Sequence, residues 1–137
     1  MIGSESGRKD AMMLRRLARP MLAAIFIGGG LESLRDPAAH AEQAKALLDR
    51  LPGDSHTLVR LDGAVKVGAG AALALGRFPK ASALLLFASL VPTTLGAHRF
   101  WAEKDAAVAK QEQVHFAKNL GLLGGLLLAI TAAERQR

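Results

Sequence analysis

The chain has 137 residues, enough for one domain. Apolar residue types make up 50% of it and 14 glycines add small residues, whereas aromatics are only 4%, so a core in water would depend mainly on Ala and Leu. The net charge is +6, but the basic residues punctuate hydrophobic runs without a zinc-ligand pattern, which disfavours nucleic-acid binding. The absence of cysteine excludes disulfides and thiol redox chemistry by the chain itself.

The first third of the chain contains two predicted elements after a polar start. Residues 1–14 are polar and basic, which predicts a disordered N-terminal arm. A hydrophobic stretch follows at about 17–34, where Pro20 is tolerated in the first turn of a helix. Residues 38–51 then have apolar side chains at helical spacing, so we expect a short amphipathic helix in the first loop.

Three more hydrophobic stretches follow, at about 58–76, 79–97 and 116–133. The segment before the last stretch is rich in Ala, Glu, Lys and Gln, which predicts a helical extension in the third loop. Pro92 should bend the third helix, because the carbonyl near Ala88 loses its donor. A hydroxyl of Thr93 or Thr94 could soften that loss.

The glycine pattern favours a membrane over water. No uncharged run reaches 18 residues, so a soluble helical bundle and a signal peptide cleaved near Ala39 stay open as alternatives. Glycine inside a water-exposed helix costs about 1 kcal/mol relative to Ala, whereas in a membrane it lets helices pack closely. Three pairs of small residues would serve this packing: Gly121 and Gly125, Ala24 and Gly28, and Ala64 and Gly68. We therefore predict an all-α, four-transmembrane-helix bundle, formed by residues 15–137 as a single membrane domain.

The distribution of basic residues indicates an orientation. Of the 18 basic residues, nine fall in the N-terminal arm, the turn between the second and third stretches, and the C-terminal tail, whereas seven are spread over the much longer opposite loops. Dense positive charge next to membrane spans is retained on the cytoplasmic side. We therefore expect a multi-pass protein of the cell membrane with both termini in the cytoplasm.

Three pieces of the sequence resemble the DoxX family of small four-helix integral membrane proteins. They are a basic start leading into Pro20-Met-Leu-Ala-Ala-Ile-Phe-Ile-Gly-Gly-Gly, then Asp62 followed by a glycine-rich helix and Gly76-Arg77-Phe-Pro, and finally His115-Phe-Ala-Lys-Asn-Leu-Gly-Leu-Leu-Gly-Gly. Together they cover about residues 15–133. These motifs are compositional rather than catalytic, so the resemblance informs the fold more than the mechanism.

The resemblance implies a part in redox systems of the inner membrane and in redox homeostasis. The family is named for a small subunit of a thiosulfate:quinone oxidoreductase, so we expect an accessory or scaffolding subunit rather than an enzyme. The sequence has no haem, flavin or iron–sulfur motif, so a redox partner protein or a bound quinone would supply the redox centre. Membrane lipid and a second copy of the chain are the other expected partners. The alternative function is a small proton-coupled transporter that uses Glu32 or Asp62.

Polar residues from separate stretches converge on the outer half of the predicted bundle. Asp62 and Lys66 are four residues apart on one helical face, and they should pair because a lone charge in hydrocarbon costs roughly 2.5–3.5 kcal/mol. We expect Glu32 and Lys118 to face inward and join them. The candidate binding residues, with no metal site and no catalytic residue assigned, are Glu32, Asp62, Lys66, His98, His115, Lys118 and Asn119.

Two interpretations of this cluster stay open. It is either a structural ion-pair network that fixes helix register, or a site for a quinone, an ion or a small polar molecule. His98 and His115 could bind a metal or relay protons, but two histidines without a third ligand fit solvation at the interface better. Phe100 and Trp101 are typical of aromatic anchors at the outer interface.

Overall fold

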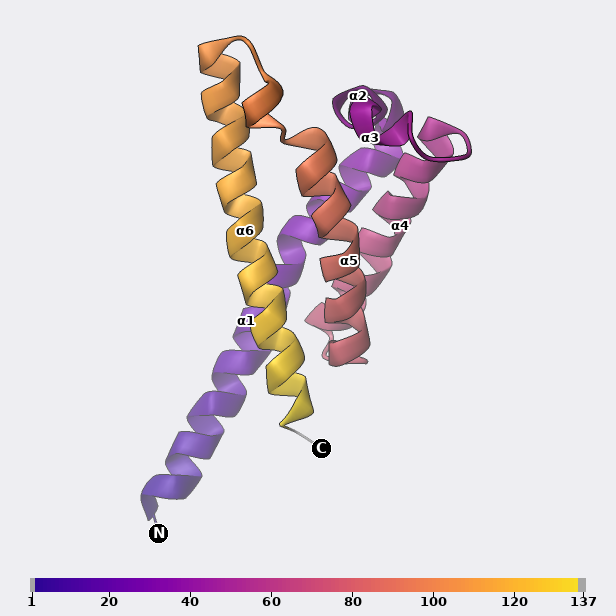
Figure 1. Ribbon diagram of the computed structural model, residues 1–137. Coiled ribbons are helices and arrows are strands. Elements are labelled where there is room, and N and C mark those ends of the chain that lie inside the picture. The colour runs from indigo at the N-terminus through magenta and orange to yellow at the C-terminus, as the bar shows by residue number, and fades with distance from the viewer. Residues whose placement is uncertain (1, 136–137) are drawn as a thin grey trace.

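The computed structural model describes residues 2–135, and it is all-helical over that range (Figure 1). The elements are α1 (Ile2–Arg35), α2 (Pro37–Gln43), α3 (Lys45–Leu48), α4 (Ser55–Ala74), α5 (Pro79–Ala97), the 3₁₀ helix η1 (Phe100–Ala102) and α6 (Ala106–Glu134). The predicted all-α class is confirmed. Met1 and residues 136–137, which belong to the expected arm and the expected domain, lie outside the described residues.

Helix α1 contradicts the prediction of a disordered arm, because it runs without a break from Ile2 to Arg35. Pro20 therefore lies inside the helix and not in its first turn, where it removes the N–H that would bind the carbonyl of Arg16. The segment before it contains Met12, Met13 and other good helix formers, and these continue the helix that the membrane segment begins. At 34 residues α1 is about 51 Å long, and its first turns project beyond the other helices (Figure 1).

The amphipathic helix expected in the first loop is present as two short helices, α2 and α3, with a break at Ala44. The break lets the two helices contact different neighbours, α2 packing on α4 and α3 on α5. A small apolar cluster of Ala41, Leu48 and Val59 holds this loop against the start of α4. Leu47 of α3 reaches α5 at Gly96, where a Cβ would lie 2.8 Å from the Leu47 Cδ2 atom.

The turn between α4 and α5 has the residues that its geometry requires. The amide of Gly76 donates to the carbonyl of Leu73 at 3.0 Å, and Gly76 adopts a φ of +69°, which glycine tolerates best. Phe78 follows with a φ of 46°, and Pro79 then opens α5 at the first helical turn. Helix α6 begins at Ala106, ten residues before the predicted 116–133 stretch, which confirms the helical extension in the third loop.

Three helices are long and apolar enough to cross a membrane, over Ser4–Arg35, Pro79–Ala102 and Ala106–Glu134. Helix α4 is not among them, so the structure supports three of the four predicted spans. The reason lies in the three charged residues that α4 carries, Arg60, Asp62 and Lys66. Hydropathy counts these charges wherever they point, although the side chain of Lys66 is only 9% exposed.

Glycines on one face of each helix bring α1 and α4 into backbone contact. A Cβ on Gly30 would lie 2.7 Å from the carbonyl oxygen of Gly63, and a Cβ on Gly63 would lie 2.9 Å from that of Gly30. Gly70 similarly abuts the side chain of Ile27. Of the expected pairs, Gly28, Gly68 and Gly121 do not serve helix packing within residues 2–135, because nothing lies within 4 Å of the place where their Cβ atoms would be, whereas a Cβ on Gly125 would lie 3.3 Å from the Leu22 Cδ1 atom.

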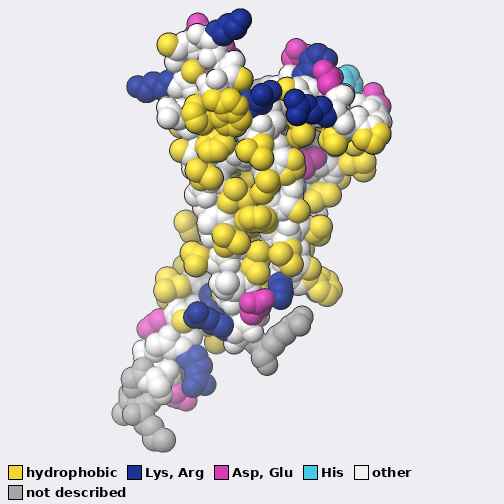
Figure 2. Space-filling view, viewed as in Figure 1, with side chains coloured by type: hydrophobic (Ala, Val, Ile, Leu, Met, Phe, Trp, Pro, Cys, Tyr) yellow, Lys and Arg dark blue, Asp and Glu magenta, His cyan; other side chains and the backbone are white. Residues whose placement is uncertain are grey.

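The long helices share one core, and its outside is apolar as well. Its fully buried members come from all four long helices and include Ala23, Leu73, Leu86 and Leu126. Many large apolar side chains are nevertheless exposed, and Figure 2 shows them around the middle of the molecule with charged side chains mostly toward the two ends. Such a belt, together with the three long apolar helices, indicates a multi-pass membrane protein rather than a soluble bundle.

Candidate functional site

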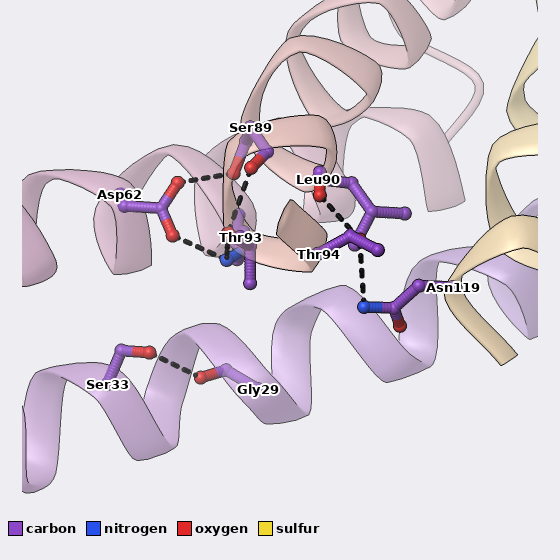
Figure 3. A network of polar contacts seen from close by, with 9 residues as sticks. Gly29, Ser33, Asp62, Ser89, Leu90, Thr93, Thr94 and Asn119 are labelled. Carbon is purple, nitrogen blue, oxygen red and sulfur yellow. Dashed lines mark hydrogen bonds and ion pairs between the residues drawn. The ribbon is translucent and has the colours of Figure 1, made fainter. Parts of the chain in front are cut away.

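The polar centre of the bundle is an ion pair between two residues of α4, and hydroxyl groups of α5 form hydrogen bonds with both of them (Figure 3). The Nζ atom of Lys66 donates to a carboxylate oxygen of Asp62, as the four-residue spacing predicted, and to the Oγ1 atom of Thr93 at 3.0 Å. Ser89 donates its hydroxyl to the other carboxylate oxygen of Asp62. The Lys66 side chain is 9% exposed and that of Asp62 is 35% exposed, so the carboxylate is the accessible member of the pair.

Hydroxyls on α5 also bind backbone near Pro92, although not where the sequence suggested. Thr93 donates to the carbonyl of Ser89 at 2.9 Å, and Thr94 donates to the carbonyl of Leu90 at 2.7 Å. Neither hydroxyl bonds to Ala88, the carbonyl that Pro92 deprives of its donor. Both hydroxyls instead become partners for other helices, Thr93 for α4 and Thr94 for α6.

Asn119 on α6 is the second buried polar residue of the site. Its side-chain amide donates to the Oγ1 atom of Thr94 at 3.0 Å, and the residue is only 3% exposed. This bond ties α6 to α5 two residues after Pro92, and Figure 3 shows Asn119 and Thr94 pointing toward each other. Asn119 was expected at the site, and the structure places it on the inward face of its helix.

Glu32 and Lys118 do not join the buried pair, so the expectation that they face inward and pair is wrong. Both are exposed, and within residues 2–135 neither forms an ion pair or a hydrogen bond through its side chain. Their neighbours explain this. Successive helical residues point about 100° apart, and the inward places are taken by Ser33, 5% exposed, and by Asn119.

The two candidate histidines lie together beside an acid that the sequence analysis missed. His98 at the end of α5 lies 2.6 Å through Nδ1 from an Oε2 atom of Glu112 on α6. Its ring stacks on that of His115, with 5.1 Å between centroids and 23° between planes. Among the described residues, no three His, Cys, Asp or Glu side chains are arranged to hold a metal ion.

Aromatic rings close the same end of the bundle. Phe100 and Trp101 of η1 make edge-to-face contacts with each other and with Phe116 of α6, at centroid distances of 5.2–5.8 Å. Trp101 is 53% exposed, as an interfacial anchor would be. This cluster fixes η1 on α6 and leaves His98 and His115 on the side that faces the other helices.

All seven candidate residues line one cavity of ≈ 770 Å³ at the end of the bundle where α2 and α3 lie. Its floor is polar and buried, formed by Lys66 and Asn119, and Glu32 and Lys118 are exposed along its rim. Its apolar walls come from α1, α4, α5 and α6 and include Ile25, Phe26, Leu58, Leu90 and Leu122. The volume lies within the roughly 300–1,000 Å³ that is usual for small-molecule sites.

Two glycines widen the cavity, because they have no side chains that would fill it. Gly28 and Gly29 line the α1 wall, and nothing lies within 4 Å of the place where their Cβ atoms would be. A side chain at either position would therefore enter the cavity without disturbing the packing of α1. The arrangement suits a small amphipathic molecule, with a polar group held at the floor or rim and an apolar part along the walls.

The residues that the sequence analysis missed carry one recognisable signal. Ser89 and Thr93 are hydroxyls four residues apart in a charge-free run, so they share a face of α5. Hydroxyls on one face of an apolar helix often serve a polar partner on the neighbouring helix. Glu112 gave no such signal, because it lies among many other polar residues in the helical extension before the last hydrophobic stretch.

Comparison with known proteins supports the family suggested by the sequence. The DoxX family model matches residues 14–99, which is more than half of the chain and extends from α1 to the end of α5. The third resembling piece, from His115 onward, lies outside the matched range. No curated protein matches the chain, and no solved structure does. By the extent of the family match, this chain belongs to the DoxX family.

Proposed function

We propose that this protein is an accessory, non-catalytic subunit of a membrane-associated oxidoreductase system in the cell membrane. Its membership in the DoxX family supports this role. The observation that carries the proposal is the cavity of ≈ 770 Å³, because a buried polar floor between apolar walls is a place for an amphipathic molecule and not a requirement of packing.

The redox centre of such a system would come from outside this chain. The sequence contains no cysteine, so the protein has no thiol to oxidise. A partner protein with its own redox group would supply the electrons, or a quinone would bind in the cavity with its ring toward Asn119 and His115. In both cases the role of this subunit is to position a membrane-soluble molecule at one face of the membrane.

Co-purification tests this role directly. Wild-type protein purified in mild detergent should carry a partner whose absorbance spectrum shows flavin, haem or iron–sulfur, and deletion should sensitise cells to redox stress. Gly29→Leu should fill the cavity and weaken the redox-stress function, whereas Gly121→Leu, at an equally open glycine outside the cavity, should not. Isolation of the chain alone, together with a deletion strain indifferent to redox stress, would overturn the proposal.

We also propose four membrane crossings, with α4 as the second and both termini in the cytoplasm. The N-terminal start of α1 and the end of α6 lie at the same end of the bundle (Figure 1), which an even number of crossings requires. The basic turn at Arg77 lies at that end too. The charges of α4 are compatible with a crossing, because the Lys66 side chain is buried and Asp62 is paired.

The natural lack of cysteine makes the topology easy to test. Single-cysteine variants Asp49→Cys and Arg77→Cys place one thiol at each end of α4. A membrane-impermeant maleimide added to intact cells should label Asp49→Cys and should reach Arg77→Cys only after permeabilisation. Labelling of both variants, or of neither, in intact cells would exclude a crossing by α4.

A proton-coupled transporter is the second candidate, and the geometry of Asp62 favours it. The carboxylate is partly exposed toward the cavity while its partner Lys66 is buried, so protonation of Asp62 would release a buried cation and couple a proton to a rearrangement. Glu32 at the rim would be an access point. In reconstituted vesicles, proton-coupled flux should then be lost in Asp62→Asn. Flux that survives both Asp62→Asn and Glu32→Gln would rule out these carriers.

A further inference from the structure

The cavity contains two ionisable residues whose charges no other residue balances. Asp62 pairs with Lys66, and His98 pairs with Glu112. His40 binds the carbonyl oxygen of Asp36 through Nδ1 at 3.0 Å, and His115 stacks on His98. Within the described residues this leaves one acid and one base along the cavity that have no hydrogen bond or ion pair, namely Glu32 and Lys118.

The two charges lie on different walls of the cavity. Glu32 is on α1 and Lys118 is on α6. These helices touch at Gly125, where a Cβ would lie 3.3 Å from the Leu22 Cδ1 atom. From that contact they diverge toward the end with α2 and α3 (Figure 1), so the acid and the base line opposite sides of the opening.

The signs of the two charges select among ligands. An anion would be attracted by Lys118 but repelled by Glu32, and a cation would be attracted by Glu32 but repelled by Lys118. A neutral molecule would leave both charges unbalanced beside an apolar wall, where electrostatic interactions are stronger than in water. A zwitterion satisfies both at once, because its two charges match the two that the protein leaves free.

The surroundings of the charges select a membrane amphiphile rather than a free zwitterion. The cavity continues from the charged rim onto apolar side chains, and two of these, Ile25 and Leu51, are exposed by 40% and 46%. An acyl chain would cover such a surface favourably, at about 0.8 kcal/mol for each buried CH₂ group. A free zwitterion would leave this surface uncovered.

We propose that the rim of the cavity binds the headgroup of a zwitterionic phospholipid of the ethanolamine type. Its phosphate lies on Lys118, its ammonium donates hydrogen bonds to the carboxylate of Glu32, and its acyl chains run along the apolar wall of α1. A primary ammonium has N–H donors for Glu32, whereas a choline headgroup has none, so the site discriminates between the two. This inference does not rest on the redox role, because it uses only the charges and walls of the cavity.

Lipid retention measured by native mass spectrometry tests the proposal. Protein is equilibrated in nanodiscs with equal amounts of phosphatidylethanolamine, phosphatidylcholine and phosphatidylglycerol that carry the same acyl chains, and the lipids that stay bound after release are counted. Wild type should retain the ethanolamine lipid at least about fivefold over the other two, which corresponds to about 1 kcal/mol. Equal retention of the three lipids would overturn the proposal.

Single variants assign the two ends of the headgroup. Glu32→Gln should abolish the preference for ethanolamine over choline, and Lys118→Gln should weaken retention of all three phosphate-bearing lipids. The matched controls are Glu42→Gln in α2 and Lys110→Gln in α6, both exposed and outside this cavity, and neither should change the pattern. An ethanolamine preference that survives Glu32→Gln would contradict the assignment.

Two further measurements separate this site from its alternatives. Gly29→Leu should remove the retained lipid, because its side chain grows into the cavity, and unchanged retention would place the lipid elsewhere. Soluble phosphoethanolamine should not displace the lipid, and displacement with equal affinity would show that the site takes a free zwitterion and would overturn the lipid proposal. None of these outcomes depends on whether a redox partner co-purifies.

Discussion

The two sides of α1 use the same residue for opposite purposes. Toward α4, Gly30 touches the backbone of Gly63, and no side chain fits between the helices. Toward α6, Gly28 and Gly29 face open space and widen a cavity. The run of three glycines at 28–30 therefore serves helix packing on one face and ligand space on the other. Which purpose each glycine serves is decided by the neighbouring helix and not by the run itself.

The same contrast holds for the acids. Asp62 on the packed side is hydrogen-bonded by Ser89 and paired with a buried lysine, whereas Glu32 on the open side has no partner among the described residues. Both acids line the cavity, but only Asp62 also links two helices through its hydrogen bonds. Changes on the packed side should alter stability, and changes on the open side should alter what the protein binds.

The largest expected effect comes from removing the acid of the packed side. Asp62→Ala leaves Lys66 as a buried cation without its counter-ion, which should lower the free energy of unfolding by roughly 3–5 kcal/mol. Unfolding in mixed micelles with increasing SDS measures this. The double variant Asp62→Leu with Lys66→Met should recover much of the loss, because it leaves no buried charge.

Glu32→Ala is the matched control on the open side. Its side chain is exposed and makes no ion pair in the described part of the chain, so the free energy of unfolding should change by no more than about 0.5 kcal/mol. If Glu32→Ala proved as damaging as Asp62→Ala, the separation between a structural side and a binding side would be lost.

The glycines give the next largest difference. Gly30→Ala puts a methyl group 2.7 Å from the carbonyl oxygen of Gly63, so α1 and α4 must separate, at about 1–3 kcal/mol. Gly29→Ala, one residue earlier, meets nothing within 4 Å and should stabilise the helix by up to about 1 kcal/mol. The same SDS titration compares them, and equal effects of both substitutions would contradict the asymmetry of α1.

A smaller effect is expected at the link between α5 and α6. Asn119→Leu keeps the number and branching of the side-chain heavy atoms but removes the hydrogen bond to Thr94, which should cost about 1 kcal/mol. Thr94 keeps its bond to the carbonyl of Leu90, so no donor is left unsatisfied. Lys118→Leu, the exposed neighbour, is the control and should be nearly neutral in unfolding. A stronger effect of the control would show that the rim also supports the fold.

Much of the fold was predictable because hydrophobic runs of this length determine helices by themselves. The long helices, the turn with Gly76 and Pro79, and the pair of Asp62 with Lys66 all follow from local spacing. The helical arm of residues 2–14 did not, because polar composition suggests disorder while the helix it continues supplies the nucleus that an isolated segment lacks.

The candidate site was predictable in its members but not in their roles. Depth along the helices brought all seven residues to one cavity, since depth depends only on position in a helix. Rotation about each helix axis was harder to predict. One helical position separates Ser33 from Glu32 and Asn119 from Lys118, and the packing of neighbouring helices decides which of them turns inward.

The smallest effect on stability should appear in the loop that leads into α4, which belongs neither to the packed side nor to the open side of α1. Asp54 caps this helix, accepting hydrogen bonds from the amide and the hydroxyl of Thr57 at 2.8 and 2.9 Å. These hydrogen bonds lower the pKa of the Asp54 carboxyl below its ordinary value of 3.8. A carboxyl whose pKa is lower in the folded state stabilises the fold above the ordinary pKa, and this contribution is lost as the pH falls through the lowered value.

When the pH is lowered below 3.8, the temperature midpoint of unfolding in detergent should therefore decrease more for wild type than for Asp54→Asn. Asparagine retains capping ability but has no charge to lose, so it isolates the titration from the cap. Other acids titrate in the same range, but they do so equally in both proteins and cancel in the difference. Parallel pH profiles for the two proteins would mean that the loop before α4 contributes nothing to stability through this charge.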